Sequence, residues 1–425
     1  MDFSTDASST ALSLADFFHG ESGDPLLPPK GFREWREQTA WAASLYEQEF
    51  LGSPSPRVRI SANGVETEVI NLNAYNYLGL ATHPEVIAAA QEALARYGSG
   101  ACGSPLLAGR SDLHRRLEEA LAAFLGRESA ILFNSGFGGA AGCVAGLLRR
   151  GDVAVADERA HVSLCDGAQL GHARLELFAH NNAEALEAAL RRHPGRRQLV
   201  LVEGIYSMDG DMADLPAICA VARAHGASVM IDEAHSVLTC GAHGRGAAEA
   251  LECEDQVGLY YGTFSKAFAG VGGFVAGKAA TIDYLRCYTR AYGYSCALPA
   301  ATVAGLLAAL DVATRDDSLR RRLRENACYF REELNGMGLD TGDSASHVVP
   351  IIIGADRLRL YTLGLELRRR GLILAPIDYP AVPVECVRFR AAVTAAHTRA
   401  DLDQALAIIR DVLALTLPGW APPST

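Results

Sequence analysis

The sequence predicts an α/β protein built on a mostly parallel sheet that helices cover on both faces, followed by a smaller C-terminal α/β domain. Short apolar segments alternate with helical stretches, and such uninterrupted segments are typical of parallel strands buried on both sides. A new strand and a final helix follow a long Ala/Leu-rich helix that begins near residue 301. In open α/β sheets, ligands bind at the carboxyl ends of the strands, so we expect the chemistry there.

Three elements are expected before the main sheet. Residues 1–30 are polar and then rich in proline, which indicates a loose arm. Apolar residues over 32–50 approximate helical spacing and predict a helix, with one interruption at Thr39. Residues 60–72 alternate in polarity, which suggests a short hairpin.

The remaining elements follow in order along the chain. After Ser111, a candidate N-cap, leucines at helical spacing predict an amphipathic helix. Strands of the main sheet are expected at 130–133, 153–156, 199–202, 228–231, 259–261 and 273–276. A further strand at 348–353 and a helix at 401–415 belong to the second domain. We therefore expect an N-terminal arm and helix over 1–58, a large domain over 59–300 and a small domain over 301–425.

Composition narrows the class of protein. The chain has 425 residues, of which 49% are hydrophobic and 21% charged, as in ordinary globular proteins. A net charge of −11 argues against general nucleic-acid binding. The ten cysteines form no CxxC pair, which indicates reduced thiols rather than a disulfide framework or a metal site. Neither a signal peptide nor a membrane span is visible, so we expect a cytoplasmic protein.

Lys266 and Asp232 each follow an apolar strand, and together they are the most informative feature. A buried carboxylate at Asp232 needs a cationic partner, which could be a protonated pyridine nitrogen or an arginine. Lys266, flanked by Thr263 and Ser265, lies between an aromatic and a glycine-rich strand, which favours a shielded amine over a solvated one. A Schiff-base lysine, an acid for the ring nitrogen and hydroxyls for the phosphate are what pyridoxal 5′-phosphate (PLP) requires.

Three further segments follow strand ends. Residues 133–139, Phe-Asn-Ser-Gly-Phe-Gly-Gly, open a helix, so their N–H groups could bind a phosphate or simply form a tight turn. His161 could stack on a flat ring, although a hydrogen-bonded surface histidine is favoured when the residue is taken alone. Ser207 lies either beside a cofactor or in an ordinary turn rich in Asp and Gly.

Arg388 and Arg390 alternate along an expected strand of the second domain, which puts both on one face. A guanidinium can hold an α-carboxylate through two parallel hydrogen bonds. An ion pair within the protein is the alternative for one of the two arginines.

In this order, the segments resemble the α-oxoamine synthase family of fold-type-I PLP enzymes. That family includes 8-amino-7-oxononanoate synthase, 2-amino-3-ketobutyrate CoA ligase, 5-aminolevulinate synthase and serine palmitoyltransferase. The resemblance covers about residues 60–415, and the matching segments are 76–80, 135–137, 203–211, 232–236, 263–266 and 390–398. Segments 75–79 and 379–383 look closest to the serine palmitoyltransferase branch.

The resemblance implies a role for each matching residue. Lys266 would form the Schiff base and act as base, Asp232 would pair with the pyridine nitrogen, and His161 would stack on the ring. Ser207 and His235 would approach the 3-hydroxyl. The residues implied at the phosphate are Ser135, Gly136, Phe137 and Thr263, with Ser295 and Cys296 reaching it from the other subunit of a homodimer. Those implied for the substrate are Asn76 and Arg390, at the amino-acid carboxylate, and Thr394, in the pocket.

The implied reaction joins a small L-amino acid (glycine, alanine or serine) to an acyl thioester of coenzyme A or a carrier protein. It releases CO2 and the free thiol and leaves an α-aminoketone. One alternative is a fold-type-I aminotransferase or lyase that uses Lys266 and Asp232 without a thioester. Another is a non-catalytic partner subunit, although the subunit of that kind in the serine palmitoyltransferase branch lacks the lysine.

Three positions depart from the family pattern. Leu238 stands where the family usually has glycine, Pro105 follows Ser104 where Ser-Arg is common, and Ala160 precedes His161 where asparagine is frequent. The sequence places these changes near the acyl or cofactor pocket, which implies an unusual acyl donor.

Overall fold

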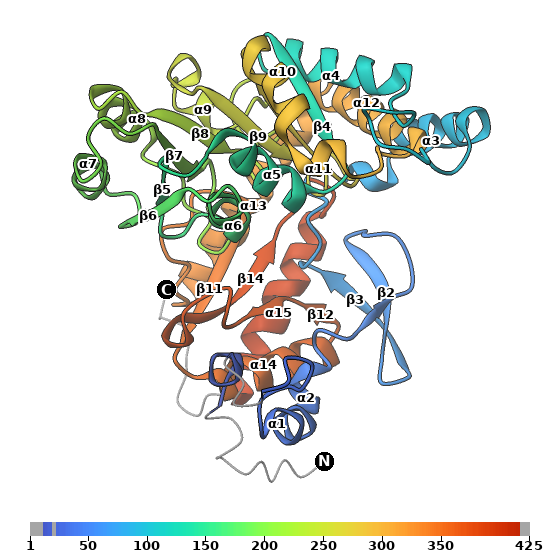
Figure 1. The fold of residues 1–425 in the computed structure, drawn as a ribbon. Coiled ribbons are helices and arrows are strands. Elements are labelled where there is room, and N and C mark those ends of the chain that lie inside the picture. Colours follow the sequence, from blue (N-terminus) through green and yellow to red (C-terminus); the bar gives the residue numbers. More distant parts are fainter. Residues whose placement is uncertain (1–11, 19–22, 417–425) are drawn as a thin grey trace. The chain divides into compact units, whose positions relative to one another are not determined.

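The computed structural model describes residues 12–18 and 23–416. They form two compact units (Figure 1). One unit comprises residues 75–207 and 211–323, and the other comprises the described residues up to 74 together with 208–210 and those from 324 onward. The domain limits predicted at residues 58 and 300 stay a prediction.

A seven-stranded sheet forms the centre of the 75–323 unit, with strand order β4-β10-β9-β8-β7-β5-β6. Its strands are β4 (Ser129–Phe133), β5 (Val153–Asp157), β6 (Arg174–Phe178), β7 (Gln198–Glu203), β8 (Ser228–Asp232), β9 (Leu259–Thr263) and β10 (Gly273–Gly277). All pairs are parallel except those of β10 with β4 and β9. Every residue of β5, β9 and β10 is buried, and because successive side chains point to opposite faces, both faces are covered, as predicted.

The sequence prediction found six of these strands and missed β6. Arg174 and Glu176 interrupt its apolar residues, and Phe178 is the one residue of this strand that is buried. An edge strand pairs on one side only, here with β5, and therefore does not need the uninterrupted apolar pattern of the central strands.

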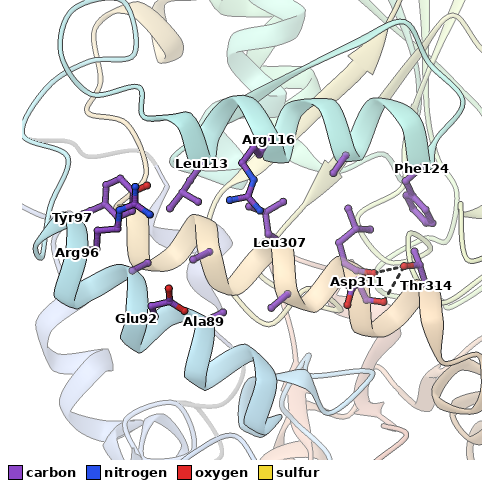
Figure 2. A pocket seen from close by; sticks show the side chains of 15 residues that line it. Ala89, Glu92, Arg96, Tyr97, Leu113, Arg116, Phe124, Leu307, Asp311 and Thr314 are labelled. Carbon is purple, nitrogen blue, oxygen red and sulfur yellow. Dashed lines mark hydrogen bonds between the residues drawn. The ribbon is translucent and has the colours of Figure 1, made fainter.

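Helices connect and cover these strands. They are α3 (Pro84–Tyr97), α4 (Asp112–Phe124), α5 (Gly136–Leu147), α6 (Val162–Leu170), α7 (Ala183–Arg191), α8 (Leu215–Ala224), α9 (Ala247–Ala250), α10 (Ala279–Tyr288), α11 (Arg290–Gly293) and α12 (Ala300–Arg315). Helix α4 begins, as predicted, after Ser111, which forms a capping box with His114. An open groove of about 780 Å³ runs between α3, α4 and α12; alanines line it, and Arg96 and Arg116 stand at its sides (Figure 2).

The other unit contains two smaller sheets. One has the order β1-β2-β3-β12, from β1 (Glu49–Phe50), β2 (Arg57–Ala62), β3 (Val65–Asn71) and β12 (Leu372–Ile373). The second has the order β11-β14-β13, from β11 (Val348–Gly354), β13 (Ala375–Ile377) and β14 (Val387–Ala392). The predicted hairpin is β2–β3, whose turn at Asn63 and Gly64 has φ values of 52° and 75°, as a tight hairpin requires.

The helices of this unit are α1 (Phe32–Gln38), α2 (Ala40–Ala43), α14 (Arg357–Arg369) and α15 (Arg399–Thr416), while α13 (Ser318–Gly336) has residues in both units. The helix predicted over 32–50 was wrong in extent: it breaks at Thr39, ends at Ala43, and gives way to β1. The Thr39 hydroxyl donates a hydrogen bond to the Trp35 carbonyl (2.8 Å), and such local bonds compete with helix continuation. Among the described residues, no helix combines the length and apolarity needed to cross a membrane.

Candidate active site

A cavity of about 330 Å³ lies in the 75–323 unit, at the ends of several strands. Asp157, Glu203, Asp232 and Thr263 are the last residues of four strands, and three of them, all but Asp157, line it. The predicted site residues that line the cavity are Ser135, Gly136, Phe137, His161, Asp232, His235, Thr263 and Lys266. The structure therefore brings together eight residues that span most of this unit's sequence.

Asp232 and Glu203 stand side by side, because they are paired in the register of β8 and β7. Both are buried, at 4% and 2% exposure, and the Ala234 N–H donates a hydrogen bond to Asp232 Oδ1 (2.8 Å). Burial raises the pKa of each carboxyl, and the positive charge of Lys266 opposes the rise. Two adjacent buried carboxyls beside a single lysine favour a second cationic group in the cavity.

Helix α5 begins at the cavity. Ser135 caps it by accepting a hydrogen bond from the Gly138 N–H (3.0 Å), and a helix N-terminus attracts an anion. Gly136 leaves room for the Thr263 hydroxyl, because a Cβ at Gly136 would lie 2.6 Å from Thr263 Oγ1. The backbone, the helix end and a hydroxyl thus converge, as a phosphate requires.

His161 is both hydrogen-bonded and part of the cavity wall. Its Nδ1 contacts Ser163 Oγ (2.7 Å) and accepts from the Ser163 N–H (3.3 Å), so that it caps α6. Its ring stands edge-on to that of Phe137, with centroids 6.2 Å apart. Partial burial lowers the pKa of His161, and the charge of Lys266 lowers it further, so the ring is neutral at pH 7.

His235 is buried at 4% exposure and is held by aromatic neighbours. The Tyr77 hydroxyl lies 2.8 Å from its Nδ1, and the Tyr75 ring packs edge-on to the imidazole. Two residues earlier in the chain, Glu233 accepts hydrogen bonds from the Ala247 and Ala248 N–H groups (2.7 and 3.0 Å). These contacts fix the segment that carries His235.

The comparisons with known proteins agree with this site. Residues 67–409 match the family described as aminotransferase class I and II. The 8-amino-7-oxononanoate synthase of Geobacter sulfurreducens is 40% identical over 352 residues, which are 82% of this chain and 89% of that protein. The chain belongs to the α-oxoamine synthases of the class I and II aminotransferase family.

Solved structures support the same assignment. The serine palmitoyltransferase of Sphingomonas wittichii has 33% identity and a TM-score of 0.87, covering 92% of this chain and 99% of that one. A serine palmitoyltransferase variant from S. paucimobilis, solved with bound PLP and myriocin, has 32% identity and a TM-score of 0.86, covering 91% and 97%. This α-oxoamine synthase therefore has the fold-type-I PLP transferase fold, as predicted, and PLP is its cofactor.

Several predicted residues of this α-oxoamine synthase do not line the cavity. Ser207 is buried in the turn after β7, where its N–H donates to Glu203 Oε2 (3.2 Å). Asn76 uses its Oδ1 to accept a hydrogen bond from the Ala81 N–H (3.1 Å). Ser295 and Cys296 lie against Asn134 of the same chain, whose Nδ2 donates to Ser295 Oγ (2.7 Å) and to the Cys296 carbonyl (2.8 Å).

Arg388 and Arg390 belong to the other unit and share a face of β14, as predicted. Arg388 forms an ion pair, with Nη1 2.5 Å from Asp209 Oδ1. Arg390 is 5% exposed and its Nη1 lies 3.7 Å from the Met208 sulfur. Thr394 in the same unit is fixed by His397, whose Nδ1 lies 2.8 Å from Thr394 Oγ1.

The three residues that depart from the family pattern do not line the cavity. Leu238 has a φ of 65°, a backbone conformation that glycine adopts without strain, and its side chain is fully buried. Burial of a leucine stabilises by about 1.5–3 kcal/mol, which offsets the strain. Pro105 and Ala160 also lie outside the lining of the cavity.

Sequence reasoning missed Glu203 and Tyr261. Glu203 ends an apolar strand in the same way as Asp232, so the same signal would have found it. Tyr261 lines the cavity, and its hydroxyl donates to the Gly136 carbonyl (2.7 Å). This contact joins segments that are distant in the sequence, so no local sequence pattern predicts it.

Replacing Gly136 by alanine should weaken binding of the cofactor. The new Cβ would push Thr263 Oγ1 away, and a lost hydrogen bond to a charged phosphate costs about 1.5–3 kcal/mol, or roughly tenfold or more in Kd. Titration of the apoprotein with PLP, followed by absorbance, measures the change. Gly138→Ala is the matched control, since its Cβ would meet Ser135 Cβ at 3.3 Å; equal affinities for the two variants would contradict the prediction.

Proposed function

We propose that the chain condenses glycine, alanine or serine with an acyl thioester and releases CO2 and the free thiol, leaving an α-aminoketone. The observation that supports it most directly is the single cavity that holds Lys266, Asp232 and His161 beside a phosphate cradle. PLP bound there supplies an electron sink for the negative charge that develops at the amino-acid Cα. The family membership directs this chemistry towards carbon–carbon bond formation.

Three residues of the cavity have proposed tasks in the reaction itself. Lys266 Nζ would hold the cofactor at its aldehyde, and the same amine, once free, would take the Cα proton. Asp232 would be the counter-charge of a protonated ring nitrogen, which would keep the ring electron-poor. Neutral His161 lies against the ring and offers Nε2 to the thioester carbonyl, because its Nδ1 is already engaged by Ser163.

The remaining predicted residues keep their proposed roles. Ser135, Gly136, Phe137 and Thr263 hold the phosphate, and His235 and Ser207 set the environment of the 3-hydroxyl. Asn76 and Arg390 bind the amino-acid carboxylate, and Thr394 contributes to the substrate pocket. The proton taken by Lys266 returns to Cα after CO2 is lost, so Lys266 ends each cycle as it began.

A cytoplasmic homodimer with shared active sites is part of the proposal. Tyr294 and Leu107 are 91% and 86% exposed, and Leu106 beside Leu107 approaches Gly293, so large apolar side chains gather next to Ser295 and Cys296. An exposed apolar patch of this kind is typical of a subunit interface. Sedimentation of the holoprotein at micromolar concentration checks it, and a monomer would contradict it.

The function is tested by supplying the holoprotein with one amino acid and one acyl thioester at a time. We expect one of the three amino acids to release CO2 and free thiol in equal amounts, measured as trapped radiolabelled CO2 and by a thiol-reactive dye. Both coenzyme A and carrier-protein thioesters should be tried with each amino acid. Conversion of the bound cofactor to pyridoxamine phosphate, with a keto-acid product and no thiol, would instead identify an aminotransferase.

A further inference from the structure

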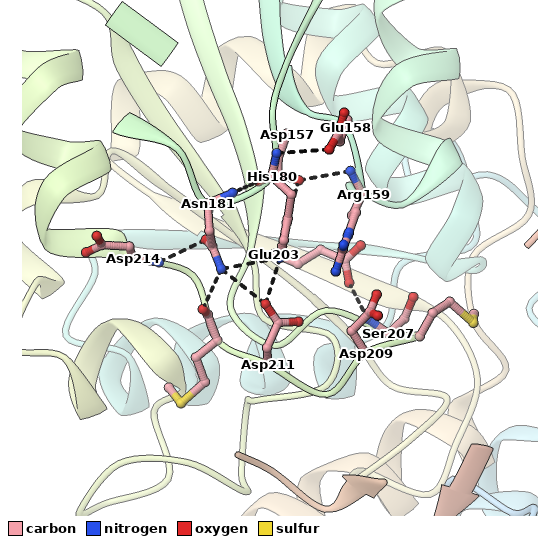
Figure 3. A network of polar contacts seen from close by, with 12 residues as sticks. Asp157, Glu158, Arg159, His180, Asn181, Glu203, Ser207, Asp209, Asp211 and Asp214 are labelled. Carbon is pink, nitrogen blue, oxygen red and sulfur yellow. Dashed lines mark hydrogen bonds and ion pairs between the residues drawn. The ribbon is translucent and has the colours of Figure 1, made fainter. Parts of the chain in front are cut away.

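A line of charged groups connects three neighbouring strands beside the cavity (Figure 3). Asp157 ends β5, His180 follows β6, and Asp211 follows β7. His180 lies between the two acids, with Nδ1 2.9 Å from Asp157 Oδ1 and Nε2 2.7 Å from Asp211 Oδ2. Asp157 has no exposed surface, so its charge is compensated within the protein.

Both ring nitrogens of His180 face carboxylate oxygens, which only accept hydrogen bonds. Both nitrogens therefore donate, and the ring carries a positive charge. Burial alone would lower the pKa of His180, but the hydrogen bonds and charges of Asp157 and Asp211 outweigh it and raise the pKa to about 9. Burial would raise the pKa of Asp157, but its hydrogen bonds from His180 and the neighbouring backbone outweigh that effect and lower it.

The two acidic residues each anchor a turn that carries a proposed cofactor residue. Asp157 accepts hydrogen bonds from the Arg159 N–H at Oδ1 and from the Ala160 N–H at its carbonyl (both 2.9 Å), directly before His161. The Asp211 carbonyl accepts from the Tyr206 N–H (3.0 Å), directly before Ser207. The His180 side chain joins these two turns, and the adjacent Asn181 supports the link, with its N–H on Asp157 Oδ2 (2.9 Å) and its Nδ2 on Asp211 Oδ2 (3.1 Å).

We propose that His180 is a positioning residue, which holds the His161 turn and the Ser207 turn at the separation that the cofactor ring needs. This inference rests on the proposed function, because it assigns His161 and Ser207 to the cofactor. His180 does not line the cavity and acts only through the two turns. Its deprotonation removes one of the two donated hydrogen bonds and thereby releases one of the turns.

The other titratable groups around the His180 ring are Glu158, Tyr206, Asp157 and Asp211. Glu158 Oε1 accepts from the His180 backbone N–H (3.1 Å), and the Tyr206 ring packs edge-on to the imidazole at 4.5 Å. Burial and the nearby acids raise the pKa of Tyr206 well above its usual value, so it stays protonated. The lowered pKa of Asp157 keeps this group ionised. The link that His180 makes between the two turns is therefore present while its imidazole is protonated. It is lost as the pH rises through about 9.

The test compares cofactor affinity in wild type and His180→Gln at two pH values. The probe is pyridoxamine 5′-phosphate, which has no aldehyde and so cannot bond Lys266; its Kd is measured by calorimetry. Any pH dependence of binding that does not involve His180 is common to both proteins and cancels in the ratio of the two Kd values. We expect the variant to bind about tenfold more weakly at pH 7.5, and the ratio to fall towards one at pH 10.

His193→Gln is the matched control, because His193 Nε2 also contacts a carboxylate, Glu176 Oε2 (3.1 Å), but at a different place in the unit. The ratio of the His193→Gln Kd to the wild-type Kd should stay near one at both pH values. Asp211→Asn keeps an acceptor but lacks the charge, so it should move the loss of affinity to lower pH, and this variant replaces His180→Gln if the latter does not fold.

Wild-type protein that binds no pyridoxamine phosphate would overturn the proposed function and this inference together. A wild type that binds it, with a His180→Gln ratio near one at pH 7.5 or a ratio independent of pH, would overturn the inference alone.

Discussion

Lys266→Ala is expected to abolish turnover. The variant loses both the amine that bonds the cofactor and the base that removes the Cα proton, and loss of positioned proton transfer alone lowers rates by about 10²–10⁴-fold. Asp232, His161 and the phosphate cradle remain, so the variant should still bind PLP, without the visible absorption of the lysine-bound form. Measurements of kcat and of the absorption spectrum report the two effects separately.

The composition of the chain allows a direct test of where the cofactor is bonded. Its lysines are Lys30, Lys266 and Lys278, so borohydride reduction followed by peptide mass spectrometry gives an unambiguous answer. We expect the label on Lys266 only. Lys278, which precedes α10, supplies the matched control variant, Lys278→Ala, with unchanged kcat. Label on Lys278, or full activity of Lys266→Ala, would contradict the assignment.

The strand ends were predictable because two signals coincide there. An uninterrupted apolar run such as 229–231 can only be a buried strand or helix core, and a charged residue directly after it must lie where the run leaves the core. Asp232 was located in this way, and Glu203 could have been, whereas the role of Thr263 came from the family resemblance. The topology then gathers the carboxyl ends of parallel strands at one edge, which places these residues in one cavity.

Contacts that depend on strand order could not be predicted. The link from Asp157 through His180 to Asp211 requires that β5 lie between β6 and β7, an order that differs from the order in the sequence. β6 itself was missed, because Arg174 and Glu176 interrupt the apolar pattern that would indicate a strand. The helix predicted over 32–50 was too long, because it ends at Ala43. The hydrogen bond from the Thr39 hydroxyl to the Trp35 carbonyl accounts only for the break at Thr39, which the sequence had indicated.

Leu238 shows a different limit. Its departure from glycine suggested an altered pocket, but the side chain is buried and the backbone keeps the conformation that glycine would adopt. Residue type alone does not reveal whether a substitution changes a binding surface or only the packing behind it.

Arg390→Ala is expected to raise the KM for the amino acid far more than the KM for the thioester. Arg390 is 5% exposed. Hydrogen bonds from such a buried guanidinium to the substrate carboxylate are charge-assisted and therefore contribute strongly to binding of the amino acid. Loss of such a charged contact costs about 2–4 kcal/mol, which corresponds to roughly a 30- to 900-fold increase in KM. Steady-state kinetics with each substrate varied in turn provides the measurement.

Arg388→Ala is the matched control, because Arg388 lies two residues away on the same face of β14 and forms an ion pair with Asp209. Its loss leaves Asp209 without this partner, so it should lower the free energy of unfolding by about 3 kcal/mol and leave the KM for the amino acid nearly unchanged. Arg390→Lys should recover part of the affinity, since it restores the charge without the paired hydrogen bonds. If Arg388→Ala raised the amino-acid KM and Arg390→Ala did not, the carboxylate would be bound by the other arginine of the pair.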